Sequence, residues 1–368
     1  MVENSFCKKE GSPVVGDRIN VKDLTLAGLE RLLTGMGAER YRAGQVAIWV
    51  FQKGAESFRE MTNLPANLRE KLDAAAVISR PEILAKKVSS KKDAVKYLFG
   101  LPDGQAVESV FMKHAYGNSV CVSTQAGCRM GCRFCASALG GLTRNLSPGE
   151  IYDQVLGIRR DTGERISSVV LMGSGEPLDN YDATLTFIKN VTAPYGLHIG
   201  CRHITVSTCG LVPGIRRLAR EKLALTLAVS LHAPNDRLRD ILVPVNRKYP
   251  LTELMAACRD YAQETGRRVT FEYALLAGVN DRKEHAEELV RLLKGKMPCH
   301  VNLIPANPVP ERGVKTPSRL QVELFKKILE RHGLAVTVRR GLGADIDAAC
   351  GQLRRKIAVM GERLNTRG

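Results

Sequence analysis

The sequence predicts an α/β protein: a partial (β/α) barrel, preceded by a small N-terminal helical domain and a connecting β-hairpin. Three observations support this fold class. From about residue 114 to residue 345, short β-rich runs alternate with amphipathic helical stretches. Polar or glycine-rich segments follow these runs, as they do at the carboxyl ends of barrel strands. Before residue 83 the apolar spacing is helical, and residues 83–113 alternate as strands do.

Four segments are expected along the chain. They are residues 1–82 as a helical accessory domain, 83–113 as a β-hairpin linker, 114–345 as the barrel core and 346–368 as a C-terminal helix or tail. The run Pro-Asp-Gly that begins at Pro102 is a turn sequence and predicts the hairpin turn. Arg40, Arg42 and Lys53 fringe the predicted accessory helices. They indicate either an RNA-binding rim or a solvated charged face.

The barrel region contains seven candidate strands. They are residues 119–123, 168–172, 203–207, 225–230, 269–275, 301–304 and 335–338. Helices between them have recognisable start signals. A capping box at residues 147–150, with proline at the first helical position, opens one helix. The Thr-Pro pair at residues 316–317 predicts another, with Leu320, Leu324 and Ile328 as its buried positions.

Composition and charge limit the possible functions. The chain has 368 residues, 44% of them apolar, which allows about two domains and a full core. No run of about 20 apolar residues occurs, so no membrane span is expected. The first residues lack the apolar core of a signal peptide, which predicts a cytoplasmic protein whose ten cysteines stay reduced. A net charge of +17 suits a polyanion, and nucleic acid is the obvious candidate.

The most informative motif is a cysteine loop, CxxxCxxC, formed by Cys128, Cys132 and Cys135. A cubic iron–sulfur cluster held by three thiolates keeps one iron free of protein ligands and open to a small molecule. A structural zinc site needs a fourth Cys or His, and none occurs in the ten residues after Cys135. The spacing therefore favours a [4Fe–4S] cluster over zinc, and both over buried cysteines without a metal.

Further motifs occur with this loop in a fixed order along the chain. They are CVSTQAGCRMGCRFC at 121–135, RNL at 144–146, MGSGEPL at 172–178, STCG at 207–210, SLHAPND at 230–236, NLIPANP at 302–308 and GADIDAACGQL at 343–353. Together they resemble the adenine-C2 RNA methyltransferases of the radical S-adenosylmethionine (radical SAM) superfamily. The resemblance implies a radical SAM barrel that methylates an adenine of 23S ribosomal RNA and, we expect, the adenine beside the tRNA anticodon.

The resemblance also assigns roles to residues. It implies that Cys128, Cys132 and Cys135 hold the cluster. The residues that it places in the S-adenosylmethionine pocket are Gly175, Glu176, Ser207, Ser230, Leu231, His232 and Asn307. Cys350 would carry the methyl group, Cys121 would be its redox and resolving partner through a disulfide bond, and Glu108 would act as an acid–base residue. Read by itself, Glu108 on a hairpin strand would be taken for a surface carboxylate.

The implied chemistry explains why two cysteines are needed. Carbon 2 of adenine is electron-poor and cannot attack the methyl group of S-adenosylmethionine, whereas a carbon radical can add to it. The Cys350 thiolate would take a methyl group from one S-adenosylmethionine by displacement. A radical from a second S-adenosylmethionine would then remove hydrogen from that methyl group and let it add to the ring. Cys121 would resolve the resulting protein–RNA thioether, so two S-adenosylmethionine molecules are used per turnover.

Several further residues have weaker signals of a role. Basic residues lie on both sides of Cys350, at 339–340 and 354–356, where an RNA backbone is expected. The loop at residues 312–315 is equally consistent with RNA contact and with a solvated loop. His232 is expected to line the pocket rather than to catalyse. The remaining cysteines are interpreted as structural: Cys7, Cys201, Cys209, Cys258 and Cys299.

The expected partners are 23S rRNA, tRNA and an electron donor such as flavodoxin or ferredoxin, with no membrane and a monomeric chain. Two alternatives stay open at this point. The antibiotic-resistance relatives methylate carbon 8 of an rRNA adenine and share the cluster and both working cysteines. A non-catalytic iron–sulfur or zinc protein that binds RNA would also share the loop and the basic charge. Brown colour in an anaerobic preparation would exclude zinc, and turnover of S-adenosylmethionine would exclude a binding module.

Overall fold

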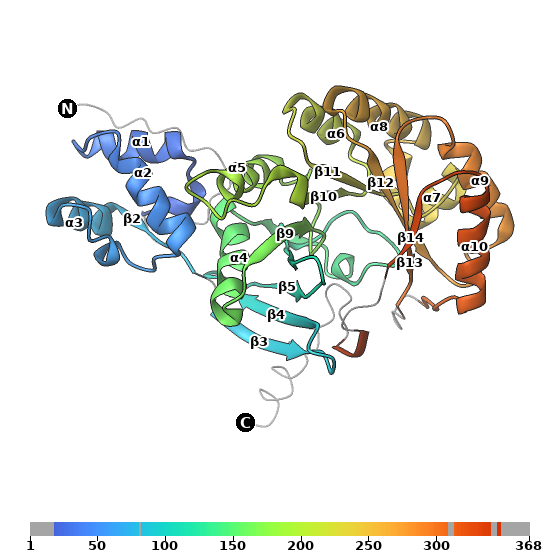
Figure 1. Ribbon diagram of the computed structural model, residues 1–368, viewed down its shortest axis with the longest axis horizontal. Coiled ribbons are helices and arrows are strands. Elements are labelled where there is room, and N and C mark those ends of the chain that lie inside the picture. The colour runs from blue at the N-terminus through green and yellow to red at the C-terminus, as the bar shows by residue number, and fades with distance from the viewer. Residues whose placement is uncertain (1–17, 81, 308–312, 340–343, 347–368) are drawn as a thin grey trace.

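The computed structural model describes residues 18–80, 82–307, 313–339 and 344–346 (Figure 1). Its strands are β1 (Ile19–Asn20), β2 (Ala76–Val77), β3 (Glu82–Val88), β4 (Ala94–Gly100), β5 (Ala106–Met112), β6 (Asn118–Cys121), β7 (Gln125–Gly127), β8 (Leu142–Asn145), β9 (Ile166–Leu171), β10 (Ile204–Thr208), β11 (Thr226–Ser230), β12 (Val269–Leu275), β13 (Cys299–Pro305) and β14 (Val336–Val338). Its α-helices are α1 (Leu26–Gly35), α2 (Arg42–Ala47), α3 (Ala66–Ala75), α4 (Pro148–Thr162), α5 (Tyr181–Thr192), α6 (Val212–Arg220), α7 (Asp236–Leu242), α8 (Leu251–Thr265), α9 (Lys283–Leu293) and α10 (Arg319–Arg331). Short 3₁₀ segments include η1 (Val21–Asp23), η4 (Ala136–Ala138) and η8 (Ala344–Ile346).

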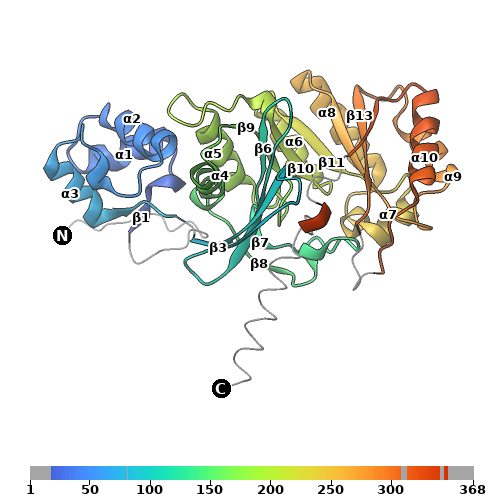
Figure 2. The same ribbon diagram turned by 60° about the horizontal axis from the view of Figure 1, so that its bottom comes forward.

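A ten-stranded sheet forms the centre of the molecule, in the order β14-β13-β12-β11-β10-β9-β6-β5-β4-β3. Neighbours from β14 to β6 are parallel, whereas β5, β4 and β3 continue the sheet antiparallel. Helices α4, α5, α6, α8, α9 and α10 lie along the outer side of the curved sheet (Figures 1 and 2). This is the predicted partial (β/α) barrel.

The two faces of the barrel strands differ in chemistry. Val206, Leu227 and Phe271 alternate with polar neighbours and are fully buried in the main core. The residues between them face the inner side. Neighbouring strands are in register there, so that Ser230 pairs with Glu272. Glu272 in turn pairs with Asn302, whose side-chain amide donates to the Glu272 carboxylate at 2.8 Å. The inner face is therefore polar and suited to a polar ligand.

The predicted hairpin is present and larger than expected. Strands β4 and β5 pair antiparallel, with Leu98 opposite Glu108. They are joined by the predicted turn, in which the Gly104 N–H donates to the Leu101 carbonyl at 2.9 Å. Strand β3 adds a third member, and β5 pairs with β6. Residues 83–113 are thus the antiparallel edge of the main sheet as well as the connection to the accessory helices.

The first barrel strand is shorter than predicted. Strand β6 ends at Cys121, not at residue 123, because Val122, Ser123 and Thr124 turn to meet the loop after β9. The Ser123 hydroxyl accepts a hydrogen bond from the Ser174 N–H at 2.8 Å, and the Thr124 N–H donates to the Ser174 carbonyl at 2.9 Å. The chain then forms β7, which pairs with β8 in a separate two-stranded sheet. This small ribbon holds the two ends of the cysteine loop together.

Two helix predictions had opposite outcomes. The capping box that opens α4 is confirmed, because the Ser147 hydroxyl accepts from the Glu150 N–H and the Glu150 carboxylate accepts from the Ser147 N–H. The buried face predicted for α10 is wrong at two of its three positions, and only Ile328 packs, partly buried, against the core. Leu320 and Leu324 are 70% and 46% exposed, and the buried residues are Val322, Phe325 and Leu329. Two apolar stripes run along this helix, and the periodicity alone does not say which one meets the sheet.

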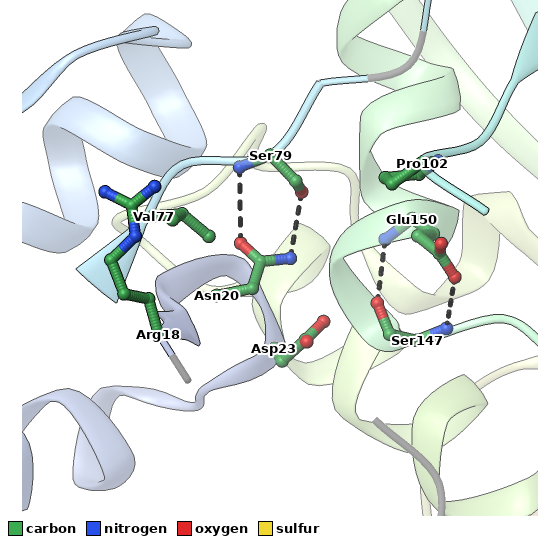
Figure 3. A pocket seen from close by; sticks show the side chains of 8 residues that line it. All are labelled: Arg18, Asn20, Asp23, Val77, Ser79, Pro102, Ser147 and Glu150. Atoms are coloured by element: carbon green, nitrogen blue, oxygen red, sulfur yellow. Dashed lines mark hydrogen bonds between the residues drawn. The ribbon is translucent and has the colours of Figure 1, made fainter. Parts of the chain in front are cut away.

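The accessory helices α1–α3 lie at one end of the molecule and meet the barrel through η1 and α4 (Figure 2). At this junction the Lys22 ammonium makes a buried ion pair with Asp153 and donates to the Ser79 carbonyl at 2.8 Å. The Ser79 hydroxyl donates to Asp153 at 2.9 Å and receives a hydrogen bond from the Asn20 amide at 2.8 Å. Figure 3 shows Asn20 and Ser79 of this network beside the small pocket at the junction.

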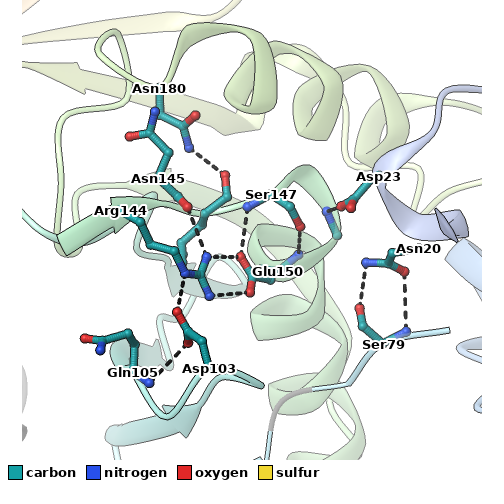
Figure 4. A network of polar contacts seen from close by, with 12 residues as sticks. Asn20, Asp23, Ser79, Asp103, Gln105, Arg144, Asn145, Ser147, Glu150 and Asn180 are labelled. Carbon is teal, nitrogen blue, oxygen red and sulfur yellow. Dashed lines mark hydrogen bonds and ion pairs between the residues drawn. The ribbon is translucent and has the colours of Figure 1, made fainter. Parts of the chain in front are cut away.

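A second polar network joins the hairpin to the cysteine loop (Figure 4). Arg144, on β8, makes a bidentate ion pair with Glu150 at 2.7 and 2.8 Å and donates to Asp103 in the β4–β5 turn at 2.5 Å. Such planar bidentate pairs fix geometry as well as adding free energy. Among the described helices, none is long and apolar enough to cross a membrane.

Candidate active site

The cysteine loop is fixed by backbone hydrogen bonds. The Cys128 N–H donates to the Gly141 carbonyl at 2.8 Å, and the Arg133 N–H donates to the Leu242 carbonyl of α7 at 3.0 Å. Gly127 has φ +83°, and a Cβ there would lie 2.1 Å from the Gly141 carbonyl oxygen. The close pairing of β7 with β8 therefore requires glycine at this position.

The three predicted cluster ligands interact electrostatically with one another. Burial raises the pKa of the Cys128 thiol to about 11, and the neighbouring Cys135 adds to that shift. Burial, followed by the negative charge of Cys135 and Cys128, raises the pKa of Cys132. Metal binding requires the thiolate form, so this environment needs a cationic centre to hold three thiolates. The donor set fits an iron–sulfur cluster in its chemistry.

Two further observations bear on that fit. Among the described residues, no group of three His, Cys, Asp or Glu side chains is arranged to hold one metal ion. A four-iron cube does not need such a one-ion arrangement, because its three thiolates bind three different irons. Among the described residues, the hydroxyl oxygens of Thr124 and Ser137 are buried without a hydrogen-bond partner. They lie just before β7 and just after Cys135, on the two flanks of the loop.

The glycine-rich turn after β9 packs directly on the segment before the cysteine loop. An added Cβ at Gly173 would lie 2.6 Å from the Ser123 hydroxyl, and one at Gly175 would lie 2.7 Å from Gln125. Gly175 also has φ +107°. This close approach places Glu176, whose N–H donates to the Gln125 side chain at 2.8 Å. The turn and the loop therefore form one rigid unit.

The Glu176 carboxylate is buried, with 3% of the residue exposed. Its oxygens accept hydrogen bonds from the Cys209 N–H at 2.7 Å and the Leu178 N–H at 3.1 Å. Burial raises its pKa, and the leading opposing contributions are hydrogen bonds from Cys209, Leu178 and Thr208. A carboxylate oxygen has lone pairs beyond those used here. Such a group can receive the ammonium of a bound amino acid.

The other predicted pocket residues lie where strands β10, β11 and β13 end. Ser207 and Ser230 are half-buried on the inner face, and Leu231 is fully buried. Asn307 is exposed just after β13. The strand ends are braced by Arg239 from α7, a fully buried residue that donates to the carbonyls of Cys209, Ser230 and Leu231. These positions converge on the same end of the barrel as the cysteine loop.

His232 is held as a neutral imidazole. It is 4% exposed, and its Nδ1 accepts a hydrogen bond from the Ala274 N–H at 2.9 Å. Burial, aided by the positive charge of Arg239, lowers its pKa to about 3. Its ring meets Phe134 of the cysteine loop edge to face, with centroids 4.5 Å apart. His232 thus buttresses the loop, in agreement with a pocket-lining role.

Cys121 and Glu108 lie near each other below this end of the barrel. Glu108 is 6% exposed, so its interpretation as a surface carboxylate is wrong: β6 and β4 flank its strand on either side. It makes a buried ion pair with Lys96 of β4, with Nζ and Oε1 3.4 Å apart. Cys121 is 8% exposed, and the charges of both Lys96 and Glu108 influence the pKa of its thiol. Cys350 and the basic residues 354–356 lie outside the described residues.

Three residues near the site were not singled out by sequence reasoning. Lys96 could have been found by extending the hairpin register from the predicted turn, which makes it a diagonal neighbour of Glu108. Cys209 was interpreted as structural, yet its carbonyl and N–H hold Arg239 and Glu176. Its position directly after β10 was the available signal. Arg239 had no sequence signal, because a lone arginine on a short helix is usually solvated.

Comparison with known proteins agrees with this geometry. Residues 122–293 match the Radical SAM superfamily, and residues 19–78 match the Ribosomal RNA large subunit methyltransferase N-terminal domain. The chain is 60% identical, over 341 residues, to the probable dual-specificity RNA methyltransferase RlmN of Desulforamulus reducens, with 92% of this chain and 97% of that protein covered. This chain belongs to the RlmN family. The relative from Desulforudis audaxviator with the same name is 63% identical over 311 residues, covering 84% of this chain and 98% of that protein.

A solved structure shows the same fold. The crystal structure of a radical SAM methyltransferase from Sphaerobacter thermophilus has a TM-score of 0.86 and 47% sequence identity, covering 91% of this chain and 98% of that chain. The resemblance inferred from the motifs is thereby confirmed, as is the barrel fold. Family membership also implies a [4Fe–4S] cluster and S-adenosylmethionine as cofactors.

Proposed function

We propose that this chain methylates carbon 2 of an adenine in 23S ribosomal RNA, and that the adenine beside the tRNA anticodon is its second substrate. The observation that carries the proposal is the joint placement of the cysteine loop, the Glu176 turn and Cys121 around the carboxyl end of one barrel. The named relatives are dual-specificity RNA methyltransferases, which supports two RNA substrates.

The chain's own residues would hold the cofactors in this arrangement. Cys128, Cys132 and Cys135 supply three thiolates to the cluster. Glu176 receives the ammonium of S-adenosylmethionine, and Ser207 and Ser230 lie half-buried where β10 and β11 end. When bound, the cluster and S-adenosylmethionine supply an electron and a carbon radical, which open a route to a carbon that displacement chemistry cannot methylate.

Two cysteines would carry the methyl group to the base. The Cys350 thiolate takes a methyl group by displacement from one of two S-adenosylmethionine molecules used per turnover. Cys121, buried on the inner face, then resolves the thioether between protein and RNA and forms a disulfide with Cys350. Glu108, beside Cys121, serves as the acid–base group. The match of the GADIDAACGQL motif supports the role of Cys350.

RNA would approach along basic surfaces. The net charge of +17, with the exposed Lys53 and the half-buried Arg42 of the accessory helices, supplies cations for the phosphate backbone. The target base must leave its stack to enter the barrel.

We further propose residues 1–82 as the RNA-binding accessory domain and a flavodoxin or ferredoxin as the electron donor. We also propose a monomeric enzyme in the cytoplasm, where its RNA substrates are.

The experiment follows the methyl group. Anaerobically reconstituted enzyme is incubated with 23S rRNA fragments or tRNA and labelled S-adenosylmethionine, and the nucleosides are analysed by mass spectrometry. We expect 2-methyladenosine; 8-methyladenosine would assign the chain to the resistance branch. Cys350→Ala should form neither methylcysteine nor methyladenine. Cys121→Ala should accumulate protein covalently joined to RNA, and methylation by Cys350→Ala would overturn the carrier mechanism.

A further inference from the structure

A buried ion pair lies under the proposed reaction site. The side chains of Lys96 and Glu108 are 1% and 7% exposed, and Nζ and Oε1 are 3.4 Å apart. Taking two charges out of water costs several kcal/mol per ion, and replacing such a pair by apolar residues is often neutral or stabilising. Stability alone therefore gives little reason to place a lysine and a glutamate inside this sheet.

The register of three strands brings this pair to Cys121. Val110 of β5 is directly opposite Lys96 of β4 and directly opposite Cys121 of β6. Directly paired residues project from the same face of a sheet, and so does Glu108, two residues before Val110. Glu108 is thus a diagonal neighbour of both Lys96 and Cys121. Diagonal Cβ atoms are roughly 7–8 Å apart, within reach of long side chains.

The electrostatics around Cys121 agree with this placement. Burial raises the pKa of the Cys121 thiol, and Glu108 adds to the shift. The positive charges of Arg339, which follows β14, and of Lys96 on β4 oppose it, as does a hydrogen bond with the backbone of Met172. A thiol that must lose a proton here needs both an acceptor and a nearby cation. Glu108 and Lys96 supply them from adjacent strands.

We propose that Lys96 is a positioning residue for the step that resolves the protein–RNA thioether: its ammonium, in the buried ion pair, holds the Glu108 carboxylate on the face of the sheet that Cys121 shares. Glu108 then takes the proton of the Cys121 thiol. The S–H bond breaks, an O–H bond forms on the carboxyl group, and the electron pair stays on sulfur, so this proton transfer needs no oxidant. The inference rests on the function proposed above and assigns to Lys96 the control of its acid–base group.

The test compares Lys96→Met with Lys96→Arg in the full-length reconstituted enzyme. The rate at which the covalent protein–RNA species resolves is followed on denaturing gels with labelled methyl groups, across neutral and alkaline pH. Removing one partner of a buried ion pair disfavours the charge that is left behind. Lys96→Met should therefore resolve the adduct roughly 10²-fold more slowly at neutral pH, the usual size of a general acid–base contribution. The rate should recover at higher pH, and Lys96→Arg should match the wild type.

Two controls separate this role from a structural one. Lys86, on β3 of the same sheet, makes an exposed ion pair with Asp161 of α4. Lys86→Met removes this pair and should leave the pH profile unchanged. The double variant Lys96→Met with Glu108→Gln removes both buried charges, so it should regain thermal stability yet stay slow at every pH. If Lys96→Met, or the double variant, resolves the adduct with the wild-type rate and pH profile, the proposal is wrong. A wild-type enzyme that forms neither methylcysteine nor adduct would instead reject the proposed function.

Discussion

Two regions of this molecule both bury polar side chains, but they differ in whether those side chains have partners within the protein. At the junction of η1 with α4, the Lys22 ammonium pairs with Asp153. Ser79 and Asn20 complete the network, and Figure 3 shows the hydrogen bonds between these two residues. Around the cysteine loop, Cys128 is also buried, yet burial disfavours its charged form and the neighbouring Cys135 thiol adds to the effect. The hydroxyls of Thr124 and Ser137 are buried there without partners among the described residues.

The difference distinguishes a structural polar cluster from a binding site. A buried polar group without a partner costs roughly 1–3 kcal/mol, and a fold retains it only when something else favours it. At the junction the partners are inside the chain, so the network holds two parts of the protein together. At the cysteine loop the described residues supply no partner for these two hydroxyls, which is what a preorganised cofactor site requires.

The largest effect should come from the cluster ligands. Cys128→Ala, Cys132→Ala or Cys135→Ala leaves two thiolates for a cluster that needs three, so iron content, brown colour and cleavage of S-adenosylmethionine should all be lost. Iron analysis and visible absorption measure the first two. Cys258→Ala, a buried cysteine on α8 away from the loop, is the matched control and should keep full iron. If a loop variant kept full iron content and activity, the assignment of these three cysteines as cluster ligands would be wrong.

Breaking the junction should cost stability and not chemistry. Lys22→Ala leaves Asp153 as an uncompensated buried carboxylate, which typically costs about 3–5 kcal/mol. The midpoint of thermal unfolding should fall, while S-adenosylmethionine cleavage per folded molecule stays the same. Lys22→Met combined with Asp153→Leu should recover much of the loss, because it leaves no unpaired charge. A full loss of cleavage by soluble, folded Lys22→Ala would contradict the separation of the two regions.

Glu176→Gln should show the opposite pattern. The amide keeps the shape, and its oxygen can still accept from the Cys209 N–H. Its NH₂ group would then face the Leu178 N–H, which loses its acceptor, while the buried charge is removed, so these effects oppose each other and the change in thermal stability should be small. Its loss of charge toward a ligand ammonium should weaken S-adenosylmethionine binding by about 1.5–3 kcal/mol, the value of a hydrogen bond to a charged group. Equilibrium dialysis with the reconstituted enzyme measures this. Unchanged affinity would place the ammonium elsewhere.

Much of the fold was predictable because local signals agree with the global pattern. The strand at 269–275, the capping box at 147–150 and the turn at Pro102 each follow from short-range chemistry. The buried face of α10 was not predictable, because Leu320 and Val322 belong to stripes of similar hydropathy and only the sheet decides between them. The early end of β6 was missed for the same reason, since its partner, Ser174, is 51 residues away from Ser123.

The candidate site divides along the same line. The CxxxCxxC spacing is enough to identify Cys128, Cys132 and Cys135, because one loop supplies all three. Lys96, Glu108 and Cys121 come from three strands, and their proximity exists only once the register is known. Arg239 is recognisable as an internal brace only from its hydrogen bonds to the strand ends. Sequence therefore identifies a site built within one segment far better than one assembled across a sheet.

The smallest effect should be a pH dependence confined to the junction. Asp23 accepts a hydrogen bond from the Gly149 N–H at 2.9 Å at the start of α4. Burial, and then the negative charges of Glu150 and Asp153, raise its pKa from 3.8 to about 6, against hydrogen bonds from Ser147 and Gly149. The folded state thus binds a proton more tightly than the unfolded state. Its contribution to stability is fully present below pH 3.8 and is lost as the pH rises through about 6.

Asp23→Asn cannot ionise and keeps an acceptor for the Gly149 N–H, so it should remove that loss. When the pH is raised from acid to mildly alkaline, the variant should gain about 1–2 kcal/mol of stability relative to the wild type. The gain is smaller than the full pKa shift would give, because solvent screens the charge of a partly exposed carboxylate. Thermal unfolding at both pH values measures the difference, and Asp260→Asn, on the exposed side of α8, is the control. If Asp23→Asn is equally destabilising at both pH values, the carboxylate acts as an ionised helix cap. The junction would then owe its stability to a charge at the α4 N-terminus and not to a proton.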